Sequence, residues 1–232
     1  MNNLKRIRLI ELLLVSFVAF GQSIFYSAVL FFAGEDNYTE ERINVRFILG
    51  VISELSAIAI LVYVLFRQGR KLKDLGLTFS WKDLPFSVLL FLGAFVVSIL
   101  FQFAISVTYH LVTGKTLNTA AQNLEVFKTS SSFFYFLYVL VNPFYEEIIA
   151  RAFVMTEVKE LFGKTYLAIA SSVILQTSYH LYQGVSSALI LFSLFLAFSL
   201  YYSKTRNITP IILAHFYFDL MAFLFYSTNS SQ

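Results

Sequence analysis

The chain contains no cysteine and few charged residues, and both absences limit what it can be. Without cysteine among its 232 residues there is no disulfide, no thiolate nucleophile and no cysteine-ligated zinc site. Charged residues make up 13% of the sequence, whereas a soluble domain has about 25%. Such a chain cannot cover its surface with polar groups, so we expect a lipid environment. The net charge of +3 is too small to indicate a nucleic-acid partner.

Long hydrophobic runs dominate what remains, since 58% of the residues are hydrophobic and 18% are aromatic. The runs cover residues 8–33, 46–67, 85–113, 132–158, 165–183, 185–203 and 208–227. About 20 apolar residues cross a bilayer as a helix. The sequence therefore predicts an all-α, polytopic helical membrane protein with about seven spans, forming one transmembrane domain over 1–232. An eighth span arises if the run 85–113 breaks near Gly93.

Lysine and arginine concentrate in alternate loops. They are Lys5, Arg6 and Arg8 before the first run, Arg67, Arg70, Lys71, Lys73 and Lys82 after the second, Lys159 and Lys164 after the fourth, and Lys204 and Arg206 after the sixth. The other loops, within 34–46 and 114–131, are acidic or poor in basic residues. The positive-inside rule then predicts a cytoplasmic N-terminus. We expect an integral protein of the cell (plasma or inner) membrane.

Three charged residues lie inside the fourth run, in the stretch VNPFYEEIIARAFVM. Charges at bilayer depth cost at least a few kcal/mol each, so they indicate a functional site or a helix–helix ion pair. Glu147 and Arg151 are four residues apart and can pair on one helix face. Glu146 is turned by about 100° from Glu147, which leaves it free to act as a general base. Pro143, just upstream, predicts a kinked or loosened helix.

Two histidines and an aspartate lie in later runs, with His180 in the fifth and His215 and Asp219 in the last. His215 and Asp219 are four residues apart and share a helix face. Helical rise from the basic loops places these three residues and Glu146 in one layer roughly 10 Å thick. The last four runs therefore predict a buried polar pocket. Two histidines with carboxylates could bind zinc, although the nearby arginine would oppose a cation.

The order Glu146-Glu147-x-x-x-Arg151, then His180, then His215-x-x-x-Asp219 resembles the CAAX protease and bacteriocin-processing (CPBP, or Abi) family of intramembrane endopeptidases. This family includes the type II CAAX prenyl proteases. The resemblance covers about 132–227, which is the expected catalytic core.

Three positions depart from the family pattern. Gln176 stands where the family usually has phenylalanine, Ala152 where it often has glycine, and Asp219 where it often has asparagine. None of these changes removes a proton-transfer group. An ionised aspartate cannot donate a hydrogen bond to an oxyanion, whereas asparagine or a protonated aspartate can. Asp219 is therefore expected either to be protonated or to orient His215.

The resemblance implies a metal-independent glutamate protease without a cofactor. Glu146 and His180 would activate a water, the ion pair with Arg151 would fix the site, and His215 with Asp219 would stabilise the oxyanion. The residues alone do not say which histidine activates water. The implied partners are the lipid bilayer and a peptide or membrane-protein substrate, prenylated or not.

Other interpretations stay open at this point. A non-catalytic immunity or scaffold protein of the same fold could keep the pocket for binding, and a zinc-dependent protease is a second alternative. A small transporter could use glutamate and histidine as a proton relay, but the sequence has no repeat symmetry to support it. Glu54, in the second run, is either a structural hydrogen-bonding residue or part of a substrate cavity.

Overall fold

A computed structural model describes residues 3–33, 40–117 and 133–229, and every regular element in these ranges is a helix. The α-helices are α1 (Asn3–Ala33), α2 (Glu40–Arg67), α3 (Asp83–Thr113), α5 (Phe133–Glu146), α6 (Val154–Phe162), α7 (Thr165–Ser178), α8 (Val185–Thr205) and α9 (Thr209–Asn229). A π-helix, Glu147–Phe153, joins α5 to α6, and two short 3₁₀ turns cover Leu72–Leu75 and Leu181–Gln183.

Five of these helical segments are long and apolar enough to cross a membrane: Asn3–Phe32, Ile43–Arg67, Asp83–Thr113, Phe133–Phe162 and Val185–Thr205. The fourth combines α5, the π-helix and α6. The described apolar part of α9, Thr209–Leu224, is shorter, and α7 has 14 residues. The prediction of an all-α polytopic membrane protein is confirmed, and helix α3 runs without a break through Gly93.

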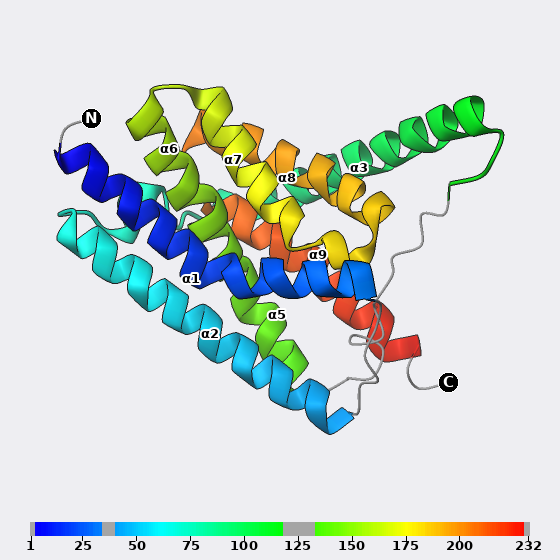
Figure 1. Cartoon of the computed structure of the whole chain (residues 1–232), viewed down its shortest axis with the longest axis horizontal. Helices are drawn as coiled ribbons and strands as arrows, with labels where there is room; N and C mark the ends of the chain where they lie inside the picture. The colour runs from blue at the N-terminus through cyan, green and yellow to red at the C-terminus, as the bar shows by residue number, and fades with distance from the viewer. Residues whose placement is uncertain (1–2, 34–39, 118–132, 230–232) are drawn as a thin grey trace.

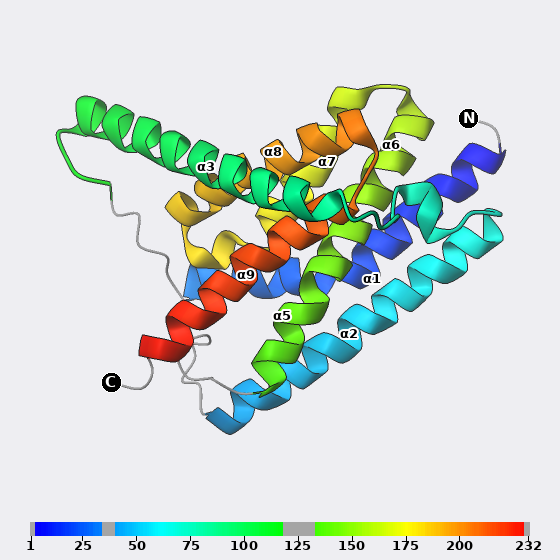
Figure 2. The same ribbon diagram turned by 180° about the vertical axis from the view of Figure 1, so that it is seen from behind.

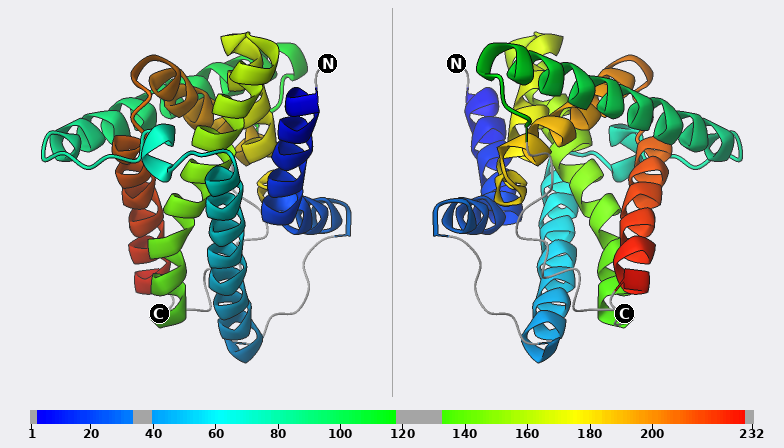
Figure 3. Two further views of the ribbon diagram at one scale, coloured as in Figure 1. Left: turned by 90° about the vertical axis from the view of Figure 1, so that its left-hand side faces the viewer. Right: turned by 90° about the vertical axis from the view of Figure 1, so that its right-hand side faces the viewer.

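Helix α5 occupies the middle of the bundle, between α2 and α9 in both views of Figure 3. Helix α1 packs against α2 and α6, α7 packs against α6 and α8, and α3 packs against α8 and α9 (Figures 1 and 2). The C-terminal part of α3 projects beyond the other helices (Figures 1 and 2). The chain thus surrounds the charged helix α5 with helices from both its N-terminal and its C-terminal parts.

Pro143 does not end α5, because the helix continues to Glu146. The departure from α-helical geometry comes one turn later, where Glu147–Phe153 forms a π-helix in which every residue is buried. Single π-turns within α-helices widen the backbone and often occur at functional sites. Here the widened turn contains both Glu147 and Arg151.

The loops rich in lysine and arginine meet at one end of the bundle. Glu157 of α6 is fully buried and accepts hydrogen bonds from Arg8 at 2.7 and 2.9 Å and from Arg70 at 2.6 Å. Arg206 donates to Thr156 at 2.7 Å. These basic residues therefore connect α1, the α2–α3 connection and the α8–α9 turn to α6. The loops predicted on the opposite side fall largely in 34–39 and 118–132, outside the described residues.

The start of α9 depends on a close backbone contact at Gly76. Gly76 has a φ of +86°, and a Cβ at this position would collide with the carbonyl group of Arg206. The amide of Ile208 donates to the carbonyl oxygen of Gly76 at 3.1 Å. This contact fixes the first turn of the helix that contains His215 and Asp219.

Candidate active site

Arg151 lies at the centre of the bundle with no exposed surface and has partners on three elements. Its guanidinium forms an ion pair with Glu147 in the same π-helix. It also donates to Gln176 of α7 at 3.0 Å and to Ser199 of α8 at 3.3 Å. The planar guanidinium suits such a site because its five N–H donors point in fixed directions.

Gln176 has a clear structural role at a position where the family pattern usually has phenylalanine. Its amide oxygen accepts from Arg151, and its amide nitrogen lies 3.0 Å from Oγ and 3.3 Å from the carbonyl oxygen of Ser172. Both ends of the buried amide are therefore satisfied. The substitution supplies the buried arginine with an acceptor that phenylalanine could not provide.

The second oxygen of Glu147 contacts His215 on α9, with Nδ1 of the imidazole 2.7 Å from Oε1. The other ring nitrogen, Nε2, lies 3.6 Å from Asp219 and 4.0 Å from Glu146. The sequence predicted two pairs, His215 with Asp219 and Glu147 with Arg151. In the structure Glu147 contacts both Arg151 and His215. Asp219 lies farther from the imidazole, at 3.6 Å.

His180 lies in a turn rather than in a helix. The run 165–183 predicted a continuous helix, but α7 ends at Ser178, and His180 precedes the 3₁₀ turn. The backbone amide of Tyr182 donates to Ser27 of α1 at 2.9 Å and fixes this turn. The imidazole of His180 packs 5.4 Å from the ring of Phe195. The hydrogen bond to Ser27 and the packing against Phe195 therefore fix the position of His180.

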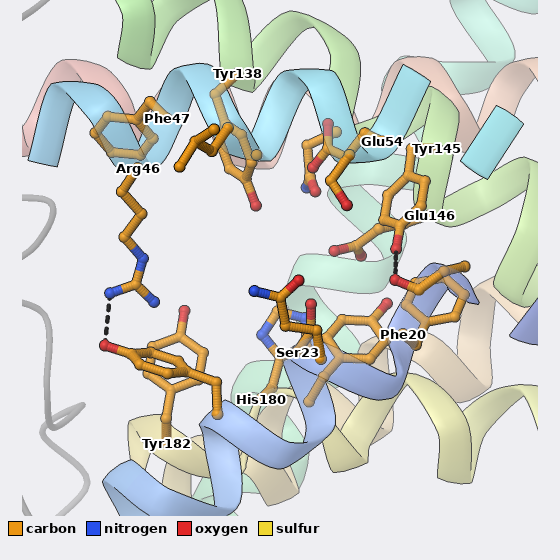
Figure 4. A pocket seen from close by; sticks show the side chains of 18 of the residues that line it. Phe20, Ser23, Arg46, Phe47, Glu54, Tyr138, Tyr145, Glu146, His180 and Tyr182 are labelled. Carbon is orange, nitrogen blue, oxygen red and sulfur yellow. Dashed lines mark hydrogen bonds between the residues drawn. The ribbon is translucent and has the colours of Figure 1, made fainter. Parts of the chain in front are cut away.

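A cavity of about 500 Å³ lies between α1, α2, α5 and the turn that contains His180 (Figure 4). Glu146 and His180 are among its lining residues, whereas Glu147, Arg151 and His215 are not. Figure 4 shows Glu54 and Glu146 towards one end and Arg46 and Phe47 towards the other. The predicted residues therefore form two layers, with Glu146 and His180 on the cavity wall and the ion-paired group behind them.

Four polar atoms on this wall are buried without a hydrogen-bond partner among the described residues. They are Oε2 of Glu54, Oε2 of Glu146, the hydroxyl oxygen of Tyr179 and Nε2 of His180. Buried polar atoms in native proteins are nearly always hydrogen-bonded, so such atoms need an explanation. A carboxylate oxygen and an imidazole nitrogen facing a polar cavity can bind a water or a substrate group.

The cavity also contains residues that sequence reasoning missed or set aside. Arg46 donates to the hydroxyl of Tyr26 at 2.6 Å, and the hydroxyl of Tyr145 donates to the carbonyl oxygen of Ala19. Glu54 reaches the wall from α2. Glu54 is the one acidic residue in the run 46–67, and this was the signal in the sequence for it. No short motif links α2 to α5.

Metal-binding geometry is absent from the described ranges. Within 3–33, 40–117 and 133–229, no group of three or more His, Cys, Asp or Glu side chains is arranged to hold a metal ion. The guanidinium of Arg151 sits beside the one carboxylate that His215 contacts closely.

Comparison with known families gives one match. Residues 128–221 match the family model described as type II CAAX prenyl endopeptidase Rce1-like. This match covers less than half of the chain and supports the predicted resemblance to the CAAX protease family. The matched residues include all six predicted site residues and leave α1, α2 and α3 outside. No curated protein and no solved structure matched the chain. Together with the long apolar helices, this match supports an integral membrane protein that is similar to the CAAX-type intramembrane proteases.

Proposed function

We propose that the protein is an intramembrane endopeptidase in which Glu146 and His180 activate a water for attack on a peptide carbonyl. The observation that supports this most is the pair of unpartnered buried atoms, Oε2 of Glu146 and Nε2 of His180, on the wall of one cavity. A cavity of about 500 Å³ can admit a water and a segment of extended peptide. Glu146 is the general base, because its carboxylate has no arginine or lysine partner among the described ion pairs.

The residues behind the wall hold the site and stabilise the reaction. Glu147 fixes His215 through Nδ1 and is itself held by Arg151. Nε2 of His215, 4.0 Å from Glu146, then points toward the reacting groups. Because Nδ1–H donates to Glu147, Nε2 is a second donor in the imidazolium form. In that form its N–H stabilises the oxyanion of the tetrahedral intermediate, an interaction worth about 3–4 kcal/mol when preorganised. Asp219 orients the imidazole or supplies a second donor when protonated.

The reaction needs no metal in this proposal. Hydrolysis is expected to persist after dialysis against a strong chelator, because the proposed water-activating groups are a carboxylate and an imidazole. Loss of activity on chelation with recovery on addition of Zn²⁺ would favour the zinc-dependent alternative instead.

The basic end of the bundle is expected to face the cytoplasm, with the N-terminus on that side. The substrate is a peptide or membrane protein, prenylated or not. Cysteine residues introduced singly at the two ends of α1, followed by labelling of intact cells, would test this orientation. If the cysteine at the N-terminal end of α1 is labelled from outside the cell, the orientation is the opposite of the one proposed.

The decisive experiment is a cleavage assay with the purified protein in liposomes, using a peptide library with prenylated and unprenylated members. Glu146→Gln is expected to lower kcat by about 10²-fold or more, because it removes a general base but keeps the side-chain size. Glu11→Gln is the matched control, since Glu11 is also a buried intramembrane carboxylate but bonds to Gln68 at 2.9 Å, away from the cavity.

Two results would contradict the proposal. Cleavage that survives Glu146→Gln at the wild-type rate would exclude the assigned base. A wild-type protein that binds peptides but cleaves none would favour the immunity or scaffold alternative.

A further inference from the structure

Glu54 brings a third acid to the candidate active site from outside the matched family region. It lies on α2, is 5% exposed and lines the same cavity as Glu146. Figure 4 shows the two carboxylates close together at one end of this cavity. A carboxylate so deeply buried in an apolar helix costs several kcal/mol unless its charge is neutralised or compensated.

Asn142 connects the two carboxylates. It precedes Glu146 by one helical turn on α5. In one orientation of its amide, the nitrogen donates to Oε1 of Glu54 at 3.1 Å and to Oε1 of Glu146 at 3.2 Å. In the other orientation, the nitrogen donates to Asp219 at 3.3 Å. The Asn142 side chain thus lies within hydrogen-bond distance of Glu54 and Glu146 in one orientation and of Asp219 in the other.

Positive charge does not compensate Glu54. Three other buried glutamates have arginine partners, since Glu11 pairs with Arg67, Glu147 with Arg151, and Glu157 with Arg8. Within the described ranges, Glu54 makes no ion pair with lysine or arginine, and its Oε2 has no hydrogen-bond partner. Two ionised carboxylates this close in a low-dielectric medium repel strongly, so the pair holds one proton between them.

We propose that Glu54 is the general acid of the reaction and protonates the leaving amine. This rests on the proposed function, in which Glu146 is the base. The oxygen of water bonds to the scissile carbonyl carbon, and a water proton passes to Glu146. The carbon–nitrogen bond then breaks, and the amine nitrogen takes the proton of Glu54. The proton on Glu146 moves to Glu54 through cavity water before the next cycle, so water supplies the hydroxyl and the hydrogen of the products.

The test compares two leaving groups in Glu54→Gln. The substrates are a peptide that the wild-type protein cleaves and its analogue with an activated phenyl ester at the scissile bond. An amine must be protonated to leave, whereas a phenolate leaves without a proton. We expect Glu54→Gln to lower kcat on the peptide by about 10²-fold and kcat on the ester by less than about tenfold. Glu54→Asp, which keeps an acid, is expected to recover part of the peptide activity.

The controls separate this inference from the proposed function. Glu11→Gln should leave the ratio of peptide to ester activity unchanged, because Glu11 bonds to Gln68 and lies outside the cavity. Equal losses on both substrates, or wild-type peptide cleavage by Glu54→Gln, would overturn the general-acid role alone. If Glu54→Gln does not fold, Glu54→Ala is measured on the same two substrates. A larger loss on the peptide than on the ester supports the role, and equal losses overturn it. A wild-type protein that cleaves neither substrate would overturn the proposed function and this inference with it.

Discussion

Removing the buried arginine should strongly destabilise the fold. Arg151→Met keeps most of the side-chain volume but deletes a guanidinium with no exposed surface. The change leaves Glu147 with only His215 as a close partner, and it leaves Gln176 without its donor. Breaking a buried ion pair by removing one partner costs about 3–5 kcal/mol. The amide oxygen of Gln176 also loses its donor. An unpaired buried polar group costs about 1–3 kcal/mol, which adds to the destabilisation.

The expected free energy of unfolding is therefore lower by at least about 3 kcal/mol, measured by reversible unfolding in mixed detergent–SDS micelles. A matched control is Arg67→Met. Arg67 pairs with Glu11 at 3.3 Å, but its side chain is 50% exposed. Because Arg67 is half exposed and Glu11 keeps its hydrogen bond from Gln68 at 2.9 Å, this variant should lose less stability than Arg151→Met.

The double variant Glu147→Gln with Arg151→Met tests whether the two charges stabilise each other. Removing both charges leaves no uncompensated ion, so the double variant should be more stable than Arg151→Met alone. The two substitutions are in direct contact and should show a coupling of about 0.5–3 kcal/mol. If Arg151→Met unfolds at the wild-type midpoint, or if the two costs simply add, Arg151 does not stabilise the site in the way described.

Three further predictions follow from individual contacts. Asp219→Asn keeps a group that can orient the imidazole and donate to an oxyanion, so kcat should be retained, whereas Asp219→Ala should lower kcat by about 10²-fold; equal activity of both variants would exclude a role for this side chain. Glu157→Gln should lower the free energy of unfolding by about 1–3 kcal/mol, because two arginines lose their buried carboxylate; unchanged detergent unfolding would contradict this. Gly76→Ala should cost at least about 1–3 kcal/mol, because alanine is strained at a φ of +86° and its Cβ collides with the carbonyl of Arg206; a wild-type midpoint would contradict the close contact.

Local patterns predicted those features that depend on one helix. Apolar runs located the helices, because each run reflects a segment in contact with lipid or with other helices. Spacing of four residues predicted the contact between Glu147 and Arg151, since such residues share a helix face. The contact of Glu147 with His215 joins residues 68 apart in sequence. No periodicity within a single helix can indicate such a pair.

The end of α7 shows a different limit. The predicted apolar run extended to residue 183, although its last residues, in QTSYHLYQG, are mostly polar or aromatic. The helix nevertheless ends at Ser178, and the turn is fixed by a hydrogen bond from Tyr182 to Ser27 of α1. The polar residues at the end of the run were a signal that the helix ends early, whereas the contact with α1 that fixes the turn could not be predicted from one segment.

The division between matched and unmatched parts of the chain has a physical consequence. Residues 128–221 contain the groups proposed to activate water and stabilise charge. The cavity in which a substrate would lie is closed by α1 and α2, outside that match, through residues that include Glu54 and Arg46. The family match covers the residues proposed to carry out the reaction, whereas part of the cavity wall comes from α1 and α2, which the match does not include. The sequence did not connect Glu54 with Glu146. The structure does, because both carboxylates lie within hydrogen-bond distance of the Asn142 side chain.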